Sequence, residues 1–205
     1  MKALIFDFDG TIAKTYPILI EYAEELNRKY GKNQINPAEI KNIGLKASIL
    51  KAEIPFWKMP ALIRDIKEII NQRIALDVKV TEGLSEVIKL ASKKYNLGIV
   101  SSNSKNSIDI FLKKNKLDKY FKFVFSESSI FGKHLVLSRM CKKYNLIPKD
   151  TYYVGDEDRD IVAAKKSGLI TIAVTWGFNS EKLLKSHNPD YLIGFPKQLR
   201  EILSV

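Results

Sequence analysis

The sequence has almost no cysteine and no long apolar run, and both absences narrow the class of protein. Cys141 is the single cysteine among 205 residues, so the chain has neither a disulfide framework nor a Cys-x-x-Cys zinc knuckle. We therefore expect a protein of a reducing compartment, the cytoplasm. No apolar run approaches the ~20 residues that a membrane-spanning helix needs. Asp7 and Asp9 also interrupt the N-terminal stretch where a signal peptide would be apolar, so we expect no membrane partner.

Arginine is also scarce, and this bears on the meaning of the positive charge. The chain has 34 basic and 23 acidic residues, which gives a formal net charge of +11. Such a charge can attract nucleic acid, anionic lipid or phosphorylated small molecules. Six of the 34 basic residues are arginines, and the other 28 are lysines scattered along the chain, whereas base readout favours arginine. We interpret these lysines as solvated helix faces and expect no nucleic-acid partner.

Short apolar runs alternate with helical patterns over most of the chain, which otherwise has the composition of an ordinary globular protein, with 45% hydrophobic and 28% charged residues. The expected strands are 3–6, 97–100, 123–125, 151–154, 171–174 and 191–193. Alternation of this kind predicts an α/β fold, a Rossmann-like parallel sheet with helices on both faces.

One stretch near the N-terminus departs from this alternation. A first helix is expected to begin after Thr15 and to end at Gly31. The helical pattern continues to about residue 75, broken by glycine and proline but without a convincing strand. We predict an inserted small helical cap domain over residues 14–80. Residues 1–13 and 81–205 would then form the α/β core domain.

Acidic residues gather where the expected strands end. Asp7 and Asp9 follow the first strand, and Asp156 and Asp160 follow the fourth. Residues two apart in an extended chain share one side, and the carboxyl ends of parallel strands share one edge of the sheet. Four carboxylates at one place would repel one another unless a hard cation with oxygen ligands offsets the charge. The sequence therefore predicts a Mg2+ site built from these four residues.

The polar residues after the strands resemble the four motifs of the haloacid dehalogenase (HAD) superfamily, in the same order and over nearly the whole chain. In order, the motifs are Asp7-Phe-Asp9-Gly-Thr11, Ser102-Asn103, Lys133 and Gly155-Asp156-x-x-x-Asp160. The predicted helical insert resembles the smaller helical cap of that superfamily. The likeness is closest to phosphoglycolate phosphatase-like members.

The resemblance implies a role for each acid. Asp7 would be the nucleophile that forms an aspartyl-phosphate. Asp9 would be the acid and base, which protonates the leaving oxygen and then activates water. Asp7, the backbone carbonyl of Asp9 and Asp156 would hold Mg2+, with Asp160 as a further ligand or as a partner of the ligands.

The resemblance also implies which side chains bind the phosphate. Ser102 and Lys133 would hydrogen-bond the phosphoryl oxygens, and Thr11 and Asn103 are expected to contact the phosphate as members of the same motifs. The chain departs from the common pattern at Lys14, where many members have an acidic residue, and at His134, where many have proline. Neither departure touches the expected chemistry.

The implied function is Mg2+-dependent hydrolysis of a small phosphomonoester, a phosphorylated metabolite for which phosphoglycolate is the leading candidate. Two alternatives stay open at this stage: a sugar-phosphate mutase of the same superfamily, and a basic binding protein that has kept the fold without the activity. The cap should select the substrate. Gly44 would either lie in a cap loop that reaches the site or end a helix, and Arg64 would meet a substrate carboxylate or solvent. The sequence favours neither a monomer nor a homodimer.

Overall fold

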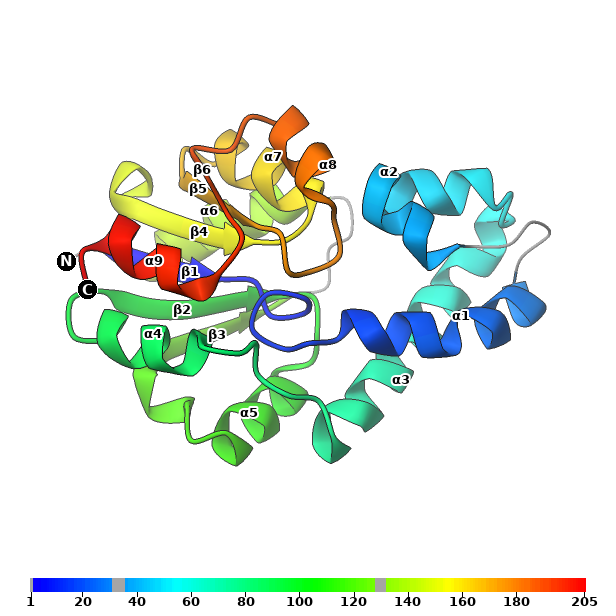
Figure 1. The fold of residues 1–205 in the computed structure, drawn as a ribbon, viewed down its shortest axis with the longest axis horizontal. Coiled ribbons are helices and arrows are strands. Elements are labelled where there is room, and N and C mark those ends of the chain that lie inside the picture. The colour runs from blue at the N-terminus through cyan, green and yellow to red at the C-terminus, as the bar shows by residue number, and fades with distance from the viewer. Residues whose placement is uncertain (1, 31–35, 128–131) are drawn as a thin grey trace.

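A six-stranded parallel sheet forms one end of the molecule and a helical lobe forms the other (Figure 1). The computed structural model describes residues 2–30, 36–127 and 132–205. The strands are β1 (Ala3–Phe6), β2 (Asn96–Ser101), β3 (Phe121–Ser126), β4 (Thr151–Gly155), β5 (Ile170–Val174) and β6 (Tyr191–Ile193), in the spatial order β3-β2-β1-β4-β5-β6. All paired strands are parallel. The α/β, Rossmann-like fold class predicted from the sequence is therefore confirmed.

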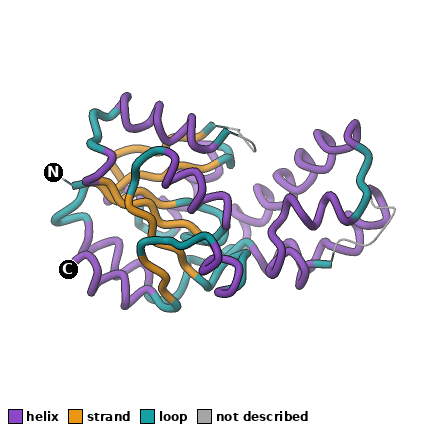
Figure 2. Tube along the Cα trace, turned by 90° about the horizontal axis from the view of Figure 1, so that it is seen from above, coloured by secondary structure: helices purple, strands orange, loops and turns teal. Residues whose placement is uncertain are grey.

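Helices cover both faces of the sheet, as Figure 2 shows. One face carries α4 (Leu84–Ala91), α5 (Lys105–Lys114) and α9 (Pro196–Leu203), and the other carries α6 (Lys133–Lys143) and α7 (Asp158–Lys166) with α8 (Glu181–Ser186) beside α7. Leu4 and Phe6 of β1 pack into the first layer, whereas Ala3 and Ile5 pack into the second. This period of two, with all four residues buried, explains why a fully apolar run forms a central strand.

The helical lobe lies between β1 and β2 in the chain and beyond the carboxyl ends of the strands (Figure 1). It consists of α1 (Tyr16–Tyr30), α2 (Pro37–Lys51), the 3-10 turn η1 (Phe56–Lys58) and α3 (Met59–Leu76), while the 3-10 turns η2 (Asp118–Tyr120) and η3 (Pro148–Asp150) belong to the core. Its own hydrophobic cluster includes Leu19, Leu26, Ile40 and Leu62. These helices lie within residues 14–80, the range predicted for the cap, and we call this lobe the cap. The helix end expected at Gly31 lies outside the described residues.

Two features connect the cap to the core. Ala13 forms an antiparallel bridge with Val80, and the amide of Lys14 donates to the carbonyl of Lys79 over 3.0 Å, so the outgoing and returning chains run side by side. In addition, the C-terminal half of α3 belongs to the core cluster through Ile70 and Ile74. A single helix therefore contributes to the hydrophobic packing of both lobes.

No helix in the described part of the chain is both long enough and apolar enough to span a membrane.

We predict that Ile74→Ala destabilises the protein far more than Leu76→Ala on the same helix. The Ile74 side chain is 0% exposed and Leu76 is 71% exposed, so only the first change leaves a cavity at the junction of cap and core. Such a cavity costs about 2–5 kcal/mol, which for a chain of this size lowers Tm by roughly 5–15 °C. Thermal unfolding of both variants measures the difference, and equal losses would contradict the packing described for α3.

Candidate active site

The carboxyl end of β1 is where the chain order in the sheet reverses. After β1 the chain forms β2 on one side, and it later crosses to form β4 on the other side. In open α/β sheets such a reversal leaves a crevice beyond the strand ends. The amide of Asp7 donates to the carbonyl of Val154 over 2.8 Å, which prolongs the pairing of β1 with β4 by one residue. The bond therefore fixes the backbone from which the Asp7 side chain enters the pocket.

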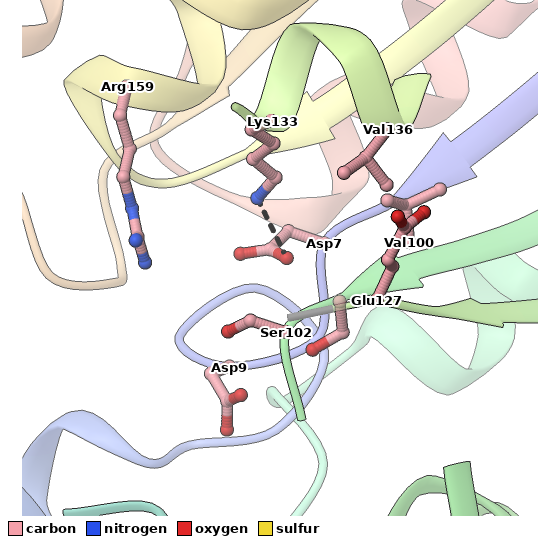
Figure 3. A pocket seen from close by; sticks show the side chains of 9 residues that line it. Asp7, Asp9, Val100, Ser102, Glu127, Lys133, Val136 and Arg159 are labelled. Carbon is pink, nitrogen blue, oxygen red and sulfur yellow. Dashed lines mark ion pairs between the residues drawn. The ribbon is translucent and has the colours of Figure 1, made fainter. Parts of the chain in front are cut away.

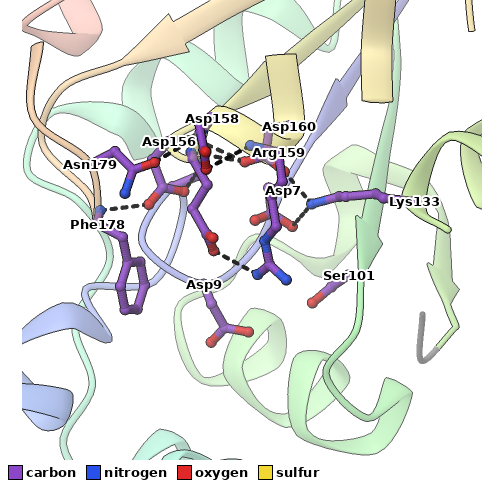
Figure 4. A network of polar contacts seen from close by, with 12 residues as sticks. Asp7, Asp9, Ser101, Lys133, Asp156, Asp158, Arg159, Asp160, Phe178 and Asn179 are labelled. Carbon is purple, nitrogen blue, oxygen red and sulfur yellow. Dashed lines mark hydrogen bonds and ion pairs between the residues drawn. The ribbon is translucent and has the colours of Figure 1, made fainter. Parts of the chain in front are cut away.

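Three of the four predicted acids meet there. Asp7, Asp156 and Asp160 are buried, and their carboxylate oxygens lie within 4.8 Å of one another. The two oxygens of Asp156 accept hydrogen bonds from Thr11 Oγ1 at 2.6 Å and from the amide of Phe178 at 2.7 Å. Oδ2 of Asp160 accepts two bonds of 3.1 Å from the amides that open the loop after β4, those of Asp156 and Glu157. Neutral donors thus hold Asp156 and one oxygen of Asp160 in place; Figure 4 shows the bond from Phe178 to Asp156.

Two glycines allow the backbone to close around Asp156. A Cβ atom at Gly10 would lie 2.2 Å from Asp156 Oδ2, and one at Gly177 would lie 2.1 Å from the same atom. Gly10 also has φ +77°, a conformation that other residues rarely adopt. These positions accept no larger residue while Asp156 keeps its orientation.

The donor set fits a divalent cation of the Mg2+ type. Burial raises the pKa of Asp7 to about 7, opposed by Lys133 and reinforced by Asp160. Burial also raises the pKa of Asp156 well above its usual range, and the charge of Asp160 raises it further. Carboxylates that are this costly to ionise together are stabilised by a hard cation, which prefers oxygen ligands. The fourth predicted acid, Asp9, has its carboxylate outside this cluster.

Lys133 supplies the positive charge at the cluster. Its Nζ lies 3.1 Å from Asp7 Oδ1 and 2.5 Å from Asp160 Oδ1, as Figure 3 shows for Asp7. Burial lowers the pKa of Lys133, but Asp160 and Asp7 outweigh burial and raise it well above the usual range. The ammonium group therefore stays charged. Lys133 is the first residue of α6.

Asp9 has a separate environment on the other side of the same pocket. The side-chain amide of Asn103 donates to both of its carboxylate oxygens, at 3.3 and 3.4 Å. Burial raises the pKa of Asp9 to about 6, and the bond from Asn103 opposes this shift. A carboxyl group with such a pKa exchanges protons readily near neutral pH, as acid–base catalysis requires.

The structure separates the four residues that were predicted to bind phosphate. Ser102 lines the pocket with Asp7, Asp9 and Lys133 (Figure 3). Thr11 is fully buried and its hydroxyl donates to Asp156, because its loop is held from behind by bonds from Thr81 and Trp176 to the Thr11 carbonyl. The side-chain amide of Asn103 is likewise directed at Asp9, so both side chains contact an acid in this structure. A phosphate contact for Thr11 and Asn103 stays a prediction.

Sequence reasoning missed two charged residues at this site. Arg159 lines the pocket, and its Nη2 donates to Glu157 Oε1 over 2.6 Å. Both residues lie inside the motif that begins at Gly155, but they occupy its variable positions. The resemblance therefore assigned them no role. The charge of Arg159 gave no signal either, because the chain has 34 basic residues.

The cap contacts the core beside this pocket. Gly44 has φ 81° and ψ 161°, which kinks α2, and a Cβ there would lie 3.3 Å from the Asp158 carboxylate. The backbone of α2 also accepts hydrogen bonds from the loop after β5, from Asn179 Nδ2 to the Ile40 carbonyl at 3.3 Å and from the Ser180 amide to the Lys41 carbonyl at 2.6 Å. The cap segment around Gly44 therefore reaches the rim of the site.

Arg64, the other cap residue considered from the sequence, does not reach the site. Its side chain is 71% exposed and pairs with its neighbour Asp65 at 3.4 Å. Of the two interpretations, the solvated arginine fits the structure.

Comparison with known proteins agrees with this geometry. The sequence profile described as haloacid dehalogenase-like hydrolase matches residues 4–174. A phosphoglycolate phosphatase of Synechococcus elongatus is 30% identical over all of this chain and 98% of its own length. Pyrophosphatase PpaX of Bacillus mycoides is 25% identical over all of this chain and 97% of its own length. A predicted phosphatase from Clostridium acetobutylicum has the same fold, with a TM-score of 0.82 and 21% identity over 100% of this chain and 99% of its own.

We predict that the metal-free protein becomes more stable as the pH falls from about 7 towards 5. The folded-state pKa values of Asp7 and Asp9 are raised to about 7 and about 6 from 3.8, so in this window the folded chain binds protons that the unfolded chain does not. Stability is then lost as the pH rises. Groups whose pKa is lowered by folding change the stability only below about pH 4, outside this window.

The same argument fixes the effect of added Mg2+. Protons and a cation compete for the same oxygens, so Mg2+ should raise Tm by several degrees at pH 8 and much less at pH 5. Differential scanning fluorimetry in chelator and in Mg2+ measures both effects, with Asp7→Asn as the variant that should flatten them. A Tm of the metal-free protein that rises between pH 5 and 7.5 would contradict the prediction.

Proposed function

The chain belongs to the haloacid dehalogenase-like hydrolase family and is a phosphatase, and we propose that it hydrolyses a small phosphomonoester with Mg2+ as cofactor. Phosphoglycolate is the leading candidate substrate. The reaction passes through an aspartyl-phosphate on Asp7.

The contrast between Asp7 and Asp9 supports this proposal best. Asp7 faces Lys133, whose charge opposes the rise of the Asp7 pKa to about 7, and a cation at the acid cluster would lower that pKa further towards the ionised form that a nucleophile needs. Asp9 contacts the neutral amide of Asn103 and has a pKa of about 6, which suits a group that gives up a proton and then takes one back. Two carboxyl groups in different environments at one site are typical of divided nucleophile and acid–base roles.

Two steps follow from these roles. First, an oxygen of Asp7 attacks phosphorus, the bond from phosphorus to the leaving oxygen breaks, and Asp9 protonates that oxygen. Second, Asp9 takes a proton from water, the water oxygen attacks phosphorus, and the bond to Asp7 breaks to release phosphate. Lys133 and Ser102 orient the phosphoryl oxygens in both steps.

We assign the cofactor to the side chains of Asp7 and Asp156 with the backbone carbonyl of Asp9. When bound, Mg2+ supplies positive charge that offsets the phosphoryl oxygens and the acid cluster. Asp160 already accepts bonds from two amides and from Lys133. Its role in this proposal is therefore to fix the ligands and Lys133 in place.

The substrate class follows from the relatives and the pocket together. One relative is named a phosphoglycolate phosphatase and another a pyrophosphatase, and both compounds named are small and carry a second anionic group. The higher identity to the first supports phosphoglycolate as the candidate. The segment at Gly44 lies against the rim of the site, which leaves room for a small leaving group.

We expect phosphate release from a panel of phosphoglycolate, sugar phosphates, nucleoside monophosphates, pyrophosphate and an aryl phosphate in Mg2+, and none in chelator. Asp7→Asn should lower kcat by about a thousandfold or more, because an amide cannot replace the nucleophile. Asp109→Asn, which makes the same change at a surface ion pair with Lys105, is the control. Turnover by Asp7→Asn at the parent rate would refute the mechanism, and isomerisation of a sugar phosphate without phosphate release would indicate a mutase.

We expect Asp9→Asn to form the phosphoenzyme slowly and then to retain it, because neither the leaving oxygen nor the attacking water has its proton partner. Acid quenching followed by intact-mass spectrometry should detect a phosphorylated chain that the parent protein does not accumulate. Hydrolysis of substrate by this variant at the parent rate would show that Asp9 is not the acid and base.

A further inference from the structure

Arg159 lines the pocket, but the two steps described above give it no role. It lies in the first turn of α7, and among the described residues that line the pocket the cations are Arg159 and Lys133. Figures 3 and 4 show the guanidinium of Arg159 on a different side of the Asp7 carboxylate from the ammonium of Lys133. Positive charge therefore faces the proposed nucleophile from two sides.

The acids of the site give a reason why one cation is too few. Asp7, Asp9 and Glu127 line the pocket, and the single ammonium of Lys133 is already paired with Asp7 and Asp160. A phosphate monoester adds up to two negative charges near neutral pH. Lys133 alone does not offset these charges, so an entering phosphoryl group needs a further cation in the wall of the pocket.

The contact with Glu157 fixes Arg159 without using all of its donors. Nη2 donates to Glu157 Oε1 over 2.6 Å, and in the described part of the chain Glu157 is the carboxylate within ion-pair distance of Arg159. Nε has no hydrogen-bond partner, although a guanidinium offers five donors in a planar fork. The Arg159 side chain is 34% exposed, whereas that of Glu157 is 7% exposed. The buried acid therefore holds a guanidinium that is still accessible from the pocket.

The charge of Arg159 is permanent, and it acts on the nucleophile. Burial lowers the pKa of Arg159, but Glu157 and Asp160 outweigh burial and raise it above its usual range. Burial raises the pKa of Asp7, and Arg159 opposes this rise in the same direction as Lys133 does. The electrostatic effect thus agrees with the placement of Arg159 beside Asp7.

From this placement we propose that Arg159 is a catalytic residue that binds the phosphoryl group in transfer, on a side of Asp7 that Lys133 does not occupy, and that Glu157 positions its guanidinium. The inference rests on the proposed function and adds two residues to it. Phosphoryl transfer spreads negative charge over three equatorial oxygens. A planar guanidinium can donate paired bonds to two such oxygens, whereas an ammonium acts as a point charge.

The first test follows from the fact that all phosphoesters share the phosphoryl group. Arg159→Gln should lower kcat/KM by about 30- to 1000-fold, and the factors for phosphoglycolate and for an aryl phosphate should agree within about threefold. Arg159→Lys, which keeps the charge but not the fork, should lose about tenfold. A loss confined to phosphoglycolate would place Arg159 at the leaving group and overturn the proposal.

Arg200→Gln is the matched control. Arg200 also pairs with a single glutamate, Glu86 at 3.5 Å, and its side chain is 38% exposed, but it does not line the pocket. Its replacement should leave kcat/KM unchanged for every substrate. An equal loss in Arg200→Gln and Arg159→Gln would show that the loss comes from the change in net charge, and the proposal would be wrong.

A double variant separates catalysis from the neutralisation of a buried acid. Arg159→Gln alone leaves Glu157 buried without its partner, which destabilises the fold, whereas Glu157→Gln with Arg159→Gln replaces the ion pair by two neutral amides. This double variant should regain the parent Tm and yet keep the full loss of kcat/KM. Activity within about threefold of the parent would show that Arg159 only neutralises Glu157, which contradicts the proposal.

Glu157→Gln alone tests the positioning role. It should lower kcat/KM of the parent by about tenfold but cause no further loss when Arg159→Gln is already present, because Glu157 acts through Arg159. Losses that simply add would show that Glu157 acts independently, and an unchanged kcat/KM would show that it does not position Arg159.

A binding measurement separates this inference from the proposed function. Calorimetry with inorganic phosphate and the Mg2+-loaded protein should show binding at least about tenfold weaker for Arg159→Gln than for the parent, with Arg200→Gln unchanged. Weaker phosphate binding in Arg159→Gln, together with a parent protein that hydrolyses no ester of the panel, would refute the phosphatase proposal and keep the phosphate contact. Turnover by the parent with unchanged phosphate binding and turnover in Arg159→Gln would refute the role of Arg159 alone.

Discussion

The fold of this protein has to hold three carboxylates within 4.8 Å of one another in a buried place. Their mutual repulsion and the cost of burying them would disperse the cluster in a loosely built protein. Here the backbone amides after β4 and that of Phe178, the hydroxyl of Thr11 and the ammonium of Lys133 all donate to these acids. The parallel sheet makes this possible, since it brings the ends of β1 and β4 to one edge in fixed register. The same hydrogen bonds therefore allow the carboxylates to lie close together and hold the site rigid.

The sequence was most informative where acidic residues directly follow an apolar run. Buried strands are visible as apolar runs, and the acids that follow them, such as Asp7 and Asp156, come directly after a run ends. The fold class could be predicted on that basis and is confirmed. Lys133 was found from its place in the series of four motifs.

The roles that could not be predicted depend on where side chains point in the folded protein. Thr11 and Asn103 belong to the motifs, but the direction of their donors is decided by Trp176 and by the acids Asp156 and Asp9, from distant parts of the chain. The packing of α3 against both lobes could not be predicted either, since a helical pattern in the sequence shows that one face is buried but not which lobe buries it.

That shared packing has a mechanical consequence. Eighteen residues in one helix span about 27 Å, and α3 is rooted in the core by Ile70 and Ile74 near one end while its other end packs in the cap through Leu62. If α3 tilts by about 10° about its core-packed end, its cap end moves by roughly 5 Å over that length. Access to the crevice can thus be controlled by a rotation small enough to keep the root packed, and the leverage comes from the length of one continuous helix.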